Sequence, residues 1–177
     1  ASGVGRSLAF ALGREGGRVL VADVDQTALD QTQSDLSAAG INADSSFCDV
    51  SSAGSVESLA VKAFDELGGA QLVFANAGIG AGEGGAMWEY AEQDWQWAFN
   101  VNVWGVINSI NAFMPRLIAQ QQEAHMVITG SGNGAFMVLP DSPIYTATKA
   151  SVQAITEALY YQTSAAQDLV KVNALFP

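Results

Sequence analysis

The amino-acid sequence predicts an α/β protein: a doubly wound parallel sheet with helices on both faces. Short continuous apolar runs, such as residues 19–22, are typical of strands buried on both faces of a parallel sheet. They alternate along the chain with longer segments whose apolar residues recur at helical spacing. The chain has 177 residues, enough for one compact domain, and the alternation continues without a break in composition. We therefore predict a single domain over residues 1–177.

The predicted elements follow one another from the first residues to the last. Residues 4–12 have helical periodicity, and the glycines at 13, 16 and 17 end this helix. The predicted strands are residues 19–22, 41–49, 72–75, 126–129 and 170–176. The remaining predicted helices are residues 27–39, 53–67, 95–118 and 144–163, with a glycine-rich loop at 78–85.

The composition excludes several classes of protein. Seven Lys and Arg against eighteen Asp and Glu give a net charge of −11, which disfavours nucleic acid and anionic membranes as partners. One cysteine, Cys48, and one histidine, His125, are too few for a disulfide or a zinc site, so we expect no metal and assign both residues structural roles. The sequence has neither a membrane-length apolar run nor a signal-peptide pattern, so we expect a cytoplasmic protein.

The first residues carry a signal for nucleotide binding. Ser2-Gly3-Val4-Gly5 opens a predicted helix, where backbone amides can approach a pyrophosphate, although a plain tight turn is the alternative. Asp23 favours nucleotide binding, because it ends the next strand, where a carboxylate can accept hydrogen bonds from an adenosine ribose. This carboxylate would repel a 2′-phosphate, so we expect NAD rather than NADP. Asp25 is the rival for this role.

A second signal is a tyrosine and a lysine four residues apart. Tyr145 and Lys149 lie on one face of a predicted helix, whereas Tyr90, Tyr160 and Tyr161 have no lysine at this spacing. A phenol titrates near pH 10 and is a poor base at neutral pH, but a neighbouring ammonium favours the phenolate. Lowering the pKa to about 7 requires roughly 4 kcal/mol, which Lys149 and a cationic nicotinamide ring could supply together. An ordinary surface pair is the alternative.

Together these residues resemble the short-chain dehydrogenases/reductases, and the resemblance covers essentially the whole chain. The family's turn reads Thr-Gly-x-x-x-Gly-x-Gly, of which Gly3 and Gly5 are present here. The resemblance implies a Rossmann-type fold. It also implies a strand before Ala1 and a continuation after Pro177, which resembles the start of the family's Pro-Gly motif. We therefore expect the domain to be truncated at both ends.

The resemblance also assigns cofactor contacts. Asp49-Val50 resembles the family's Asp-Val pair, whose carboxylate meets adenine, and Asn76-Ala77-Gly78 resembles its Asn-Ala-Gly motif, which lines the cofactor cleft. For Asn76 a local turn role is compatible with this function. The implied cofactor-binding residues are Ser2, Gly3, Val4, Gly5, Asp23, Asp49, Val50, Asn76, Ala77, Gly78, Tyr145, Lys149 and Pro177.

The implied catalytic residues are Asn102, Ser131, Tyr145 and Lys149. Tyr145 would remove the hydroxyl proton of an alcohol as hydride leaves for the nicotinamide, and Ser131 would bind the substrate oxygen. Lys149 would lower the tyrosine pKa and bind the nicotinamide ribose. Asn102 would hold a water in a proton relay, with Asn100 as the alternative. The interval between Ser131 and Tyr145 is one residue longer than usual in the family, and we place the extra residue in the intervening loop.

The expected function is hydride transfer between NAD(H) and a secondary alcohol or ketone. The expected substrate contacts are Ser131, Asn133, Phe136, Met137 and Tyr145, with Ile79 and Gly80 across the cleft. Their apolar character favours a hydrophobic or aromatic substrate. A dinucleotide-binding sensor is one alternative, although such proteins characteristically lack the tyrosine. An epimerase or dehydratase that recycles NAD is another.

The resemblance further implies a homodimer or homotetramer, formed through the long helices that carry Asn102 and Tyr145. Hydrophobic residues make up 49% of the chain and charged residues only 14%, which agrees with burial between subunits. Four tryptophans, at positions 88, 95, 97 and 104, are predicted to pack in the core or at a subunit interface rather than to form an aromatic binding surface.

Overall fold

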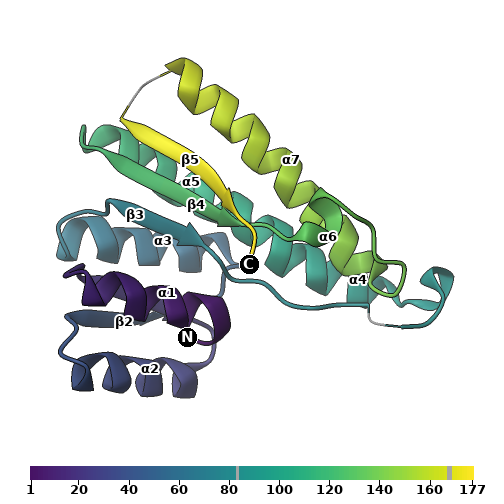
Figure 1. The fold of residues 1–177 in the computed structure, drawn as a ribbon, viewed down its shortest axis with the longest axis horizontal. Coiled ribbons are helices and arrows are strands. Elements are labelled where there is room, and N and C mark those ends of the chain that lie inside the picture. The colour runs from purple at the N-terminus through teal and green to yellow at the C-terminus, as the bar shows by residue number, and fades with distance from the viewer. Residues whose placement is uncertain (83, 167–168) are drawn as a thin grey trace.

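The computed structural model describes residues 1–82, 84–166 and 169–177, and within them helices pack against parallel strands (Figure 1). Strands β1 (Val19–Asp23) and β2 (Ala43–Phe47) form one parallel pair. Strands β3 (Leu72–Ala75), β4 (Ala124–Thr129) and β5 (Val170–Leu175) form a second parallel sheet in the order β3-β4-β5. The α/β fold class is thereby confirmed. The described strands form two sheets rather than one, because no described strand runs between β1 and β3.

The helices agree with the predicted periodicity, with two additions. The helical elements are α1 (Gly3–Arg14), α2 (Gln26–Ala38), α3 (Ala53–Val61), η1 (Lys62–Glu66), η2 (Met87–Glu89), α4 (Glu92–Phe99), η3 (Asn100–Trp104), α5 (Gly105–Ala119), α6 (Gly132–Ala135) and α7 (Pro143–Ala166). The long helix predicted at 95–118 is continuous through α4, the π-helical η3 and α5. The additions, η2 and α6, are single turns, too short to produce a periodic pattern.

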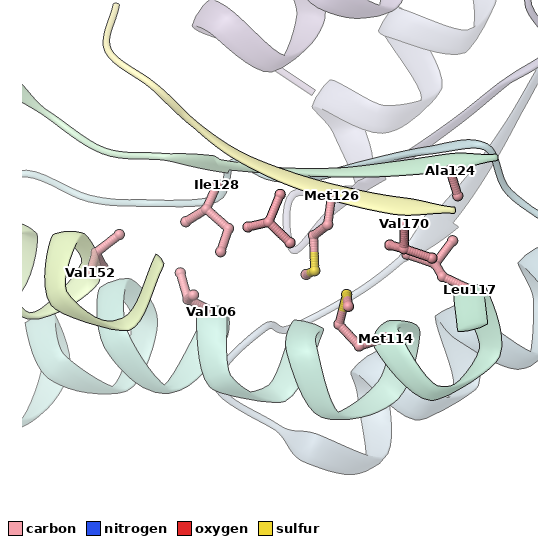
Figure 2. Packing of buried hydrophobic residues seen from close by; sticks show 9 residues of the cluster. Val106, Met114, Leu117, Ala124, Met126, Ile128, Val152 and Val170 are labelled. Atoms are coloured by element: carbon pink, nitrogen blue, oxygen red, sulfur yellow. The ribbon is translucent and has the colours of Figure 1, made fainter. Parts of the chain in front are cut away.

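The largest apolar cluster lies between the three-stranded sheet and the helices α5 and α7 (Figure 2). Met126 and Ile128 of β4 point toward α5, where Val106 and Met114 meet them, and Val152 of α7 joins from the side. All five side chains are buried. This packing fixes α7 against the end of β4, which positions the residues described below.

Helices cover β1 on both of its faces. Val21 packs in a cluster with Leu29 and Leu36 of α2, while Leu20 packs against a second cluster that contains Val56 of α3. Alternate residues of the strand therefore face opposite helix layers, as expected for a strand buried on both sides.

The four tryptophans do not share one environment. Trp95 packs against a small cluster that contains Ala98 and Ile144. Trp88, Trp97 and Trp104 have exposed fractions of 87%, 55% and 53%. Trp95 therefore packs in the core as predicted, whereas Trp88, Trp97 and Trp104 are not covered by the described residues of this chain. Their predicted place at a subunit interface stays a prediction.

Candidate active site

The residues predicted to carry the chemistry meet beside the carboxyl ends of β3 and β4. Asn76-Ala77-Gly78 follows β3, Ser131 follows β4, and Tyr145 and Lys149 lie in the first turns of α7. Figure 1 shows α4, α6 and the beginning of α7 gathered at this end of the molecule. The carboxyl ends of strands are where open α/β sheets bind their ligands.

Lys149 is buried and points at the end of β4. Lys149 is only 4% exposed, and its Nζ atom donates a hydrogen bond to the main-chain carbonyl of Thr129 at 2.8 Å. None of the ion pairs among the described residues includes it. Burial without a carboxylate partner lowers the pKa of Lys149 below its ordinary value. The ammonium is thus held at a fixed, buried place, where its electrostatic action on neighbouring groups is stronger than in water.

Tyr145 lies next to this ammonium with its own hydroxyl free. The Nζ atom of Lys149 is 5.8 Å from the centroid of the Tyr145 ring. The ring is half-buried, and its hydroxyl has no hydrogen-bond partner in the part of the chain that the structure describes. A phenol so placed is available to a substrate oxygen.

Asn102 is the buried centre of a hydrogen-bond network. It lies on the π-helical η3, is 1% exposed, and exchanges hydrogen bonds with the Ile79 backbone: Nδ2 donates to the carbonyl at 2.9 Å and Oδ1 accepts from the amide at 2.8 Å. Nδ2 also donates to Oγ1 of Thr148 at 3.0 Å, and Thr148 donates in turn to the Tyr145 carbonyl at 2.8 Å. Both Nδ2 hydrogens are therefore committed to protein, so a water could only use the remaining Oδ1 lone pair or the main-chain carbonyl. Asn100, the alternative, is exposed.

Ser131 is the N-cap of α6, and its Oγ accepts from the Asn133 amide at 3.2 Å. Its position depends on Gly134, which has a φ of +93°. A Cβ added to Gly134 would lie 2.6 Å from the Ala150 amide nitrogen and 2.7 Å from the Thr146 carbonyl oxygen. The α6 backbone therefore rests directly on the turn of α7 that carries Lys149, and this contact holds Ser131 near it.

The predicted substrate residues divide into an inner one and exposed ones. Asn133 is 7% exposed, and its Oδ1 accepts from Thr146 Oγ1 at 2.7 Å and from the Leu139 amide at 3.2 Å. Phe136 and Met137 are 72% and 55% exposed. Asn133 thus anchors the loop to α7, while the apolar side chains line the surface of that loop.

The amino end of α1 presents free backbone amides. Ser2, its N-cap, makes no side-chain cap hydrogen bond, and the first turn has no acidic residue. A Cβ on Gly5 would lie 2.9 Å from Nδ2 of Asn76, so any larger residue there would require the Asn76 side chain to shift. A groove of about 600 Å³ connects this helix end to the end of β5 and is lined by Gly3, Val4, Ser7, Leu8, Ala11, Leu175 and Pro177.

The two rival aspartates have different surroundings. Asp25 is the N-cap of α2, where its side chain accepts from the Ala28 amide at 3.0 Å. Asp23 ends β1, and its carboxylate accepts a hydrogen bond from the Asp25 amide at 3.0 Å. The geometry leaves Asp23 as the strand-end carboxylate and gives Asp25 a helix-capping role.

Asp49 makes contacts with nearby residues of the chain, and Val50 contacts α5. Asp49 Oδ1 accepts from the amide and the hydroxyl of Ser51 at 2.9 and 2.7 Å. The Val50 carbonyl accepts from Asn108, and a Cβ on Gly105 would lie 2.8 Å from the Val50 side chain. These contacts fix the segment after β2 against α5.

Ordinary sequence reasoning missed two groups at this site. The Thr129 carbonyl, which receives the Lys149 hydrogen bond, is a main-chain atom and has no sequence signature. Thr148, which joins Asn102 to the Tyr145 carbonyl, precedes the lysine by one residue, and a hydroxyl residue between the predicted tyrosine and lysine is the signal that could have indicated it.

In the described ranges, no three His, Cys, Asp or Glu side chains gather as a metal site. No described helix is long and apolar enough to cross a bilayer.

Comparison with known proteins gives a consistent result. The family model for short chain dehydrogenases matches residues 1–177. The 1-deoxy-11-beta-hydroxypentalenate dehydrogenase of Streptomyces exfoliatus is 35% identical over 159 residues, which are 90% of this chain and 58% of that protein. The chain therefore spans a little more than half the length of this curated relative.

Solved structures agree with the sequence comparison. A short chain dehydrogenase/reductase from Burkholderia phymatum in complex with NAD superposes with a TM-score of 0.91 at 38% identity, covering 98% of this chain and 61% of that one. A metagenomic short-chain oxidoreductase in complex with NADP gives 0.90 at 26% identity, covering 99% and 77%. Because the family model covers every residue and the relatives align over nearly the whole chain, this chain belongs to the short-chain dehydrogenase/reductase family.

Proposed function

We propose that the protein transfers hydride between NAD(H) and a secondary alcohol or ketone, with Tyr145 as general acid and base. The observation that carries this proposal is the Tyr145 ring, whose hydroxyl is free, 5.8 Å from the Nζ atom of a buried, hydrogen-bonded Lys149. A fixed ammonium stabilises negative charge that develops on a neighbouring oxygen, and a hydroxyl without a protein partner is open to a substrate oxygen. Neither feature is needed for packing alone.

The site residues divide the work among themselves. Tyr145 takes the hydroxyl proton of the alcohol, or returns it to the ketone oxygen in the reverse direction. Ser131 donates its own hydroxyl hydrogen to the substrate oxygen, since in the described structure its Oγ acts only as an acceptor. Lys149 binds the nicotinamide ribose, and Asn102 holds the Ile79 segment and α7 together. A bound nicotinamide dinucleotide supplies the hydride acceptor or donor.

The residues present fit a dinucleotide. The free amides at the start of α1 suit a pyrophosphate, and Asp23 ends the neighbouring strand, where a ribose would bind. A Cβ on Gly78 would lie 3.5 Å from Lys149 Nζ and 3.3 Å from Asn102 Oδ1, so glycine keeps the approach to the lysine open for a ribose. Related structures hold NAD or NADP, and the Asp23 carboxylate favours NAD by repelling a 2′-phosphate.

The substrate we propose is a hydrophobic alcohol or ketone. The loop after α6 presents four consecutive exposed apolar side chains: Phe136, Met137, Val138 and Leu139. The Phe136 ring lies 4.9 Å from that of Phe176 at the end of β5. In this proposal the substrate directly contacts Ser131, Phe136, Met137 and Tyr145. Asn133 acts indirectly, through the loop that it anchors. By its name, the relative from Streptomyces exfoliatus is a dehydrogenase of a hydroxylated compound, 1-deoxy-11-beta-hydroxypentalenate.

A second copy of this chain is the proposed occupant of an apolar groove between α5 and α7. The groove has a volume of about 260 Å³ and is lined by Ile107, Ile110, Ile155, Ala158, Leu159 and Gln162. Trp104, one turn before Ile107, is exposed, and Oε1 of Gln153 is buried without a partner among the described residues. We propose a homodimer or homotetramer built on this face, to be tested by light scattering of the wild type and of Ile110→Asp.

The experiment that tests the function is a titration with NADH and with NADPH, followed by a panel of aromatic and aliphatic ketones added to the tighter complex. Tighter binding of NADH and ketone-dependent oxidation are the expected results. Tight binding without oxidation would instead support the sensor. Product formation without net NADH consumption would support the epimerase or dehydratase. Failure to bind either dinucleotide would contradict the proposal.

A further inference from the structure

Two segments far apart in the sequence meet where α7 begins. The amide of Tyr145 donates to the carbonyl of Ala81 at 3.3 Å, and the amide of Gly84 donates to the carbonyl of Asp141 at 2.9 Å. Ala81 is buried in a cluster with Ile144, the residue directly before Tyr145. The glycine-rich segment is therefore a support for the first turn of α7.

Tyr90 holds this support in place. Its hydroxyl lies 3.1 Å from the carbonyl oxygen of Gly82 and also contacts that of Gly84. Its ring is half-buried and packs, with Trp95, against the cluster of Ala81, Ala98 and Ile144. The Tyr90 hydroxyl thus contacts two carbonyls of the glycine-rich segment, and the Tyr90 ring packs this segment against α4 and α7.

Because it is rich in glycine, the segment that supports α7 depends on contacts from outside the segment, such as that of the Tyr90 hydroxyl. Gly82 and Gly84 have φ values of +68° and +76°, which glycine adopts more readily than other residues. Because glycine also adopts many other backbone conformations, these residues do not fix the segment by themselves. A Cβ on Gly82 would lie 2.8 Å from the Ile144 side chain, so the packing of this segment against Ile144 comes from the small side chain of Ala81. The Tyr90 hydroxyl supplies a further restraint.

We propose that Tyr90 is a positioning residue for Tyr145, acting through the carbonyls of Gly82 and Gly84 and the Ala81 contact. This inference rests on the proposed function, in which Tyr145 handles the proton. The Tyr145 hydroxyl has no partner within the described chain, so its place is set by its backbone and by the packing of Ile144. A displacement of about 1 Å at such a group can reduce the rate of catalysis about 100-fold.

The test compares Tyr90→Phe with Tyr161→Phe. Both changes delete one phenol oxygen, but Tyr161 is 63% exposed on α7 and its hydroxyl has no hydrogen bond within the described residues. In Tyr90→Phe we expect kcat to fall about tenfold, while NADH affinity and the KM for the ketone stay unchanged. In Tyr161→Phe we expect wild-type values for all three.

A second measurement makes the result independent of turnover. Hydrogen exchange at the Tyr145 amide reports the contact with Ala81 directly, and we expect it to accelerate about tenfold in Tyr90→Phe and not in Tyr161→Phe. If the wild type shows no turnover, the proposed function fails and the amide exchange alone decides the role of Tyr90. Exchange equal in the two variants, or faster exchange with unchanged kcat in an active enzyme, would overturn the inference.

Discussion

Nζ of Lys149 donates a hydrogen bond to the main-chain carbonyl of Thr129 at 2.8 Å, which ties the first turns of α7 to the end of β4. A carbonyl dipole satisfies one of the three ammonium hydrogens without neutralising the charge. The positive charge therefore remains available to Tyr145, while the lysine side chain is fixed in position.

The buried charge of Lys149 makes stability depend on pH. Because burial lowers the pKa of Lys149 below 10.5, the unfolded state binds more protons between the lowered pKa and 10.5, and stability rises with pH across that window. The free energy of unfolding, measured in urea relative to Lys149→Met, should therefore increase for the wild type as the pH approaches 10.5. Lys171, exposed on β5, gives the control Lys171→Met, whose difference from the wild type should not vary. A pH-independent difference for Lys149→Met would contradict the assignment.

Gly134 should tolerate no side chain. Gly134→Ala places a Cβ against the Ala150 and Thr146 backbone at a positive φ, so we expect a loss of at least about 2 kcal/mol of stability and a displaced Ser131. Gly132→Ala is the matched control, since a Cβ there meets nothing within 4 Å, and it should change stability by no more than about 0.5 kcal/mol. Urea unfolding of both variants decides the matter, and equal losses would refute the contact.

Replacing Asn102 should lower the free energy of unfolding, whereas replacing Asn100 should not. Asn102→Ala removes three hydrogen bonds and leaves the part-buried amide and carbonyl of Ile79 without these partners, which costs about 2–4 kcal/mol. Asn100 lies on the same π-helical turn but is exposed, so Asn100→Ala is the control. Calorimetric or urea unfolding should separate the two, and similar stabilities would show that the network is dispensable.

The strand-end carboxylate should set the choice of dinucleotide. In Asp23→Asn the repulsion of a 2′-phosphate is lost, and we expect the ratio of NADPH to NADH affinity to rise about tenfold, equivalent to about 1.4 kcal/mol. Asp25→Asn keeps a side chain that can cap α2 and should leave the ratio unchanged. Fluorescence titration measures both variants. A change in the Asp25 variant alone would transfer the role to Asp25.

How much of this could be predicted from the sequence differs between residues. The helical spacing of Tyr145 and Lys149 predicts their shared face, and the apolar runs predict the strands that end beside them, because both depend on local periodicity. The Thr129 carbonyl could not be predicted, since a main-chain acceptor is the same for every residue. The fit of Gly134 against α7 depends on the approach of two backbones, which a sequence pattern does not encode.

The environment of Asn102 shows a second limit. Its place on the long helix follows from the sequence, but the π-helical turn around it and its bonds to Ile79 and Thr148 depend on tertiary packing. Whether Trp88, Trp97 and Trp104 pack in the core or at an interface could not be predicted, because the spacing of an aromatic residue is the same whether its face is covered by its own chain or by a partner.

The most direct test of the proposed chemistry is the rate of NADH-dependent ketone reduction by Tyr145→Phe. The variant keeps the ring beside Lys149 and removes only the hydroxyl, so NADH affinity should be retained while kcat falls about 100-fold or more. Tyr161→Phe, measured in parallel, should behave as the wild type. If Tyr145→Phe keeps most of the turnover, Tyr145 is not the general acid and base, and the account of this site is wrong.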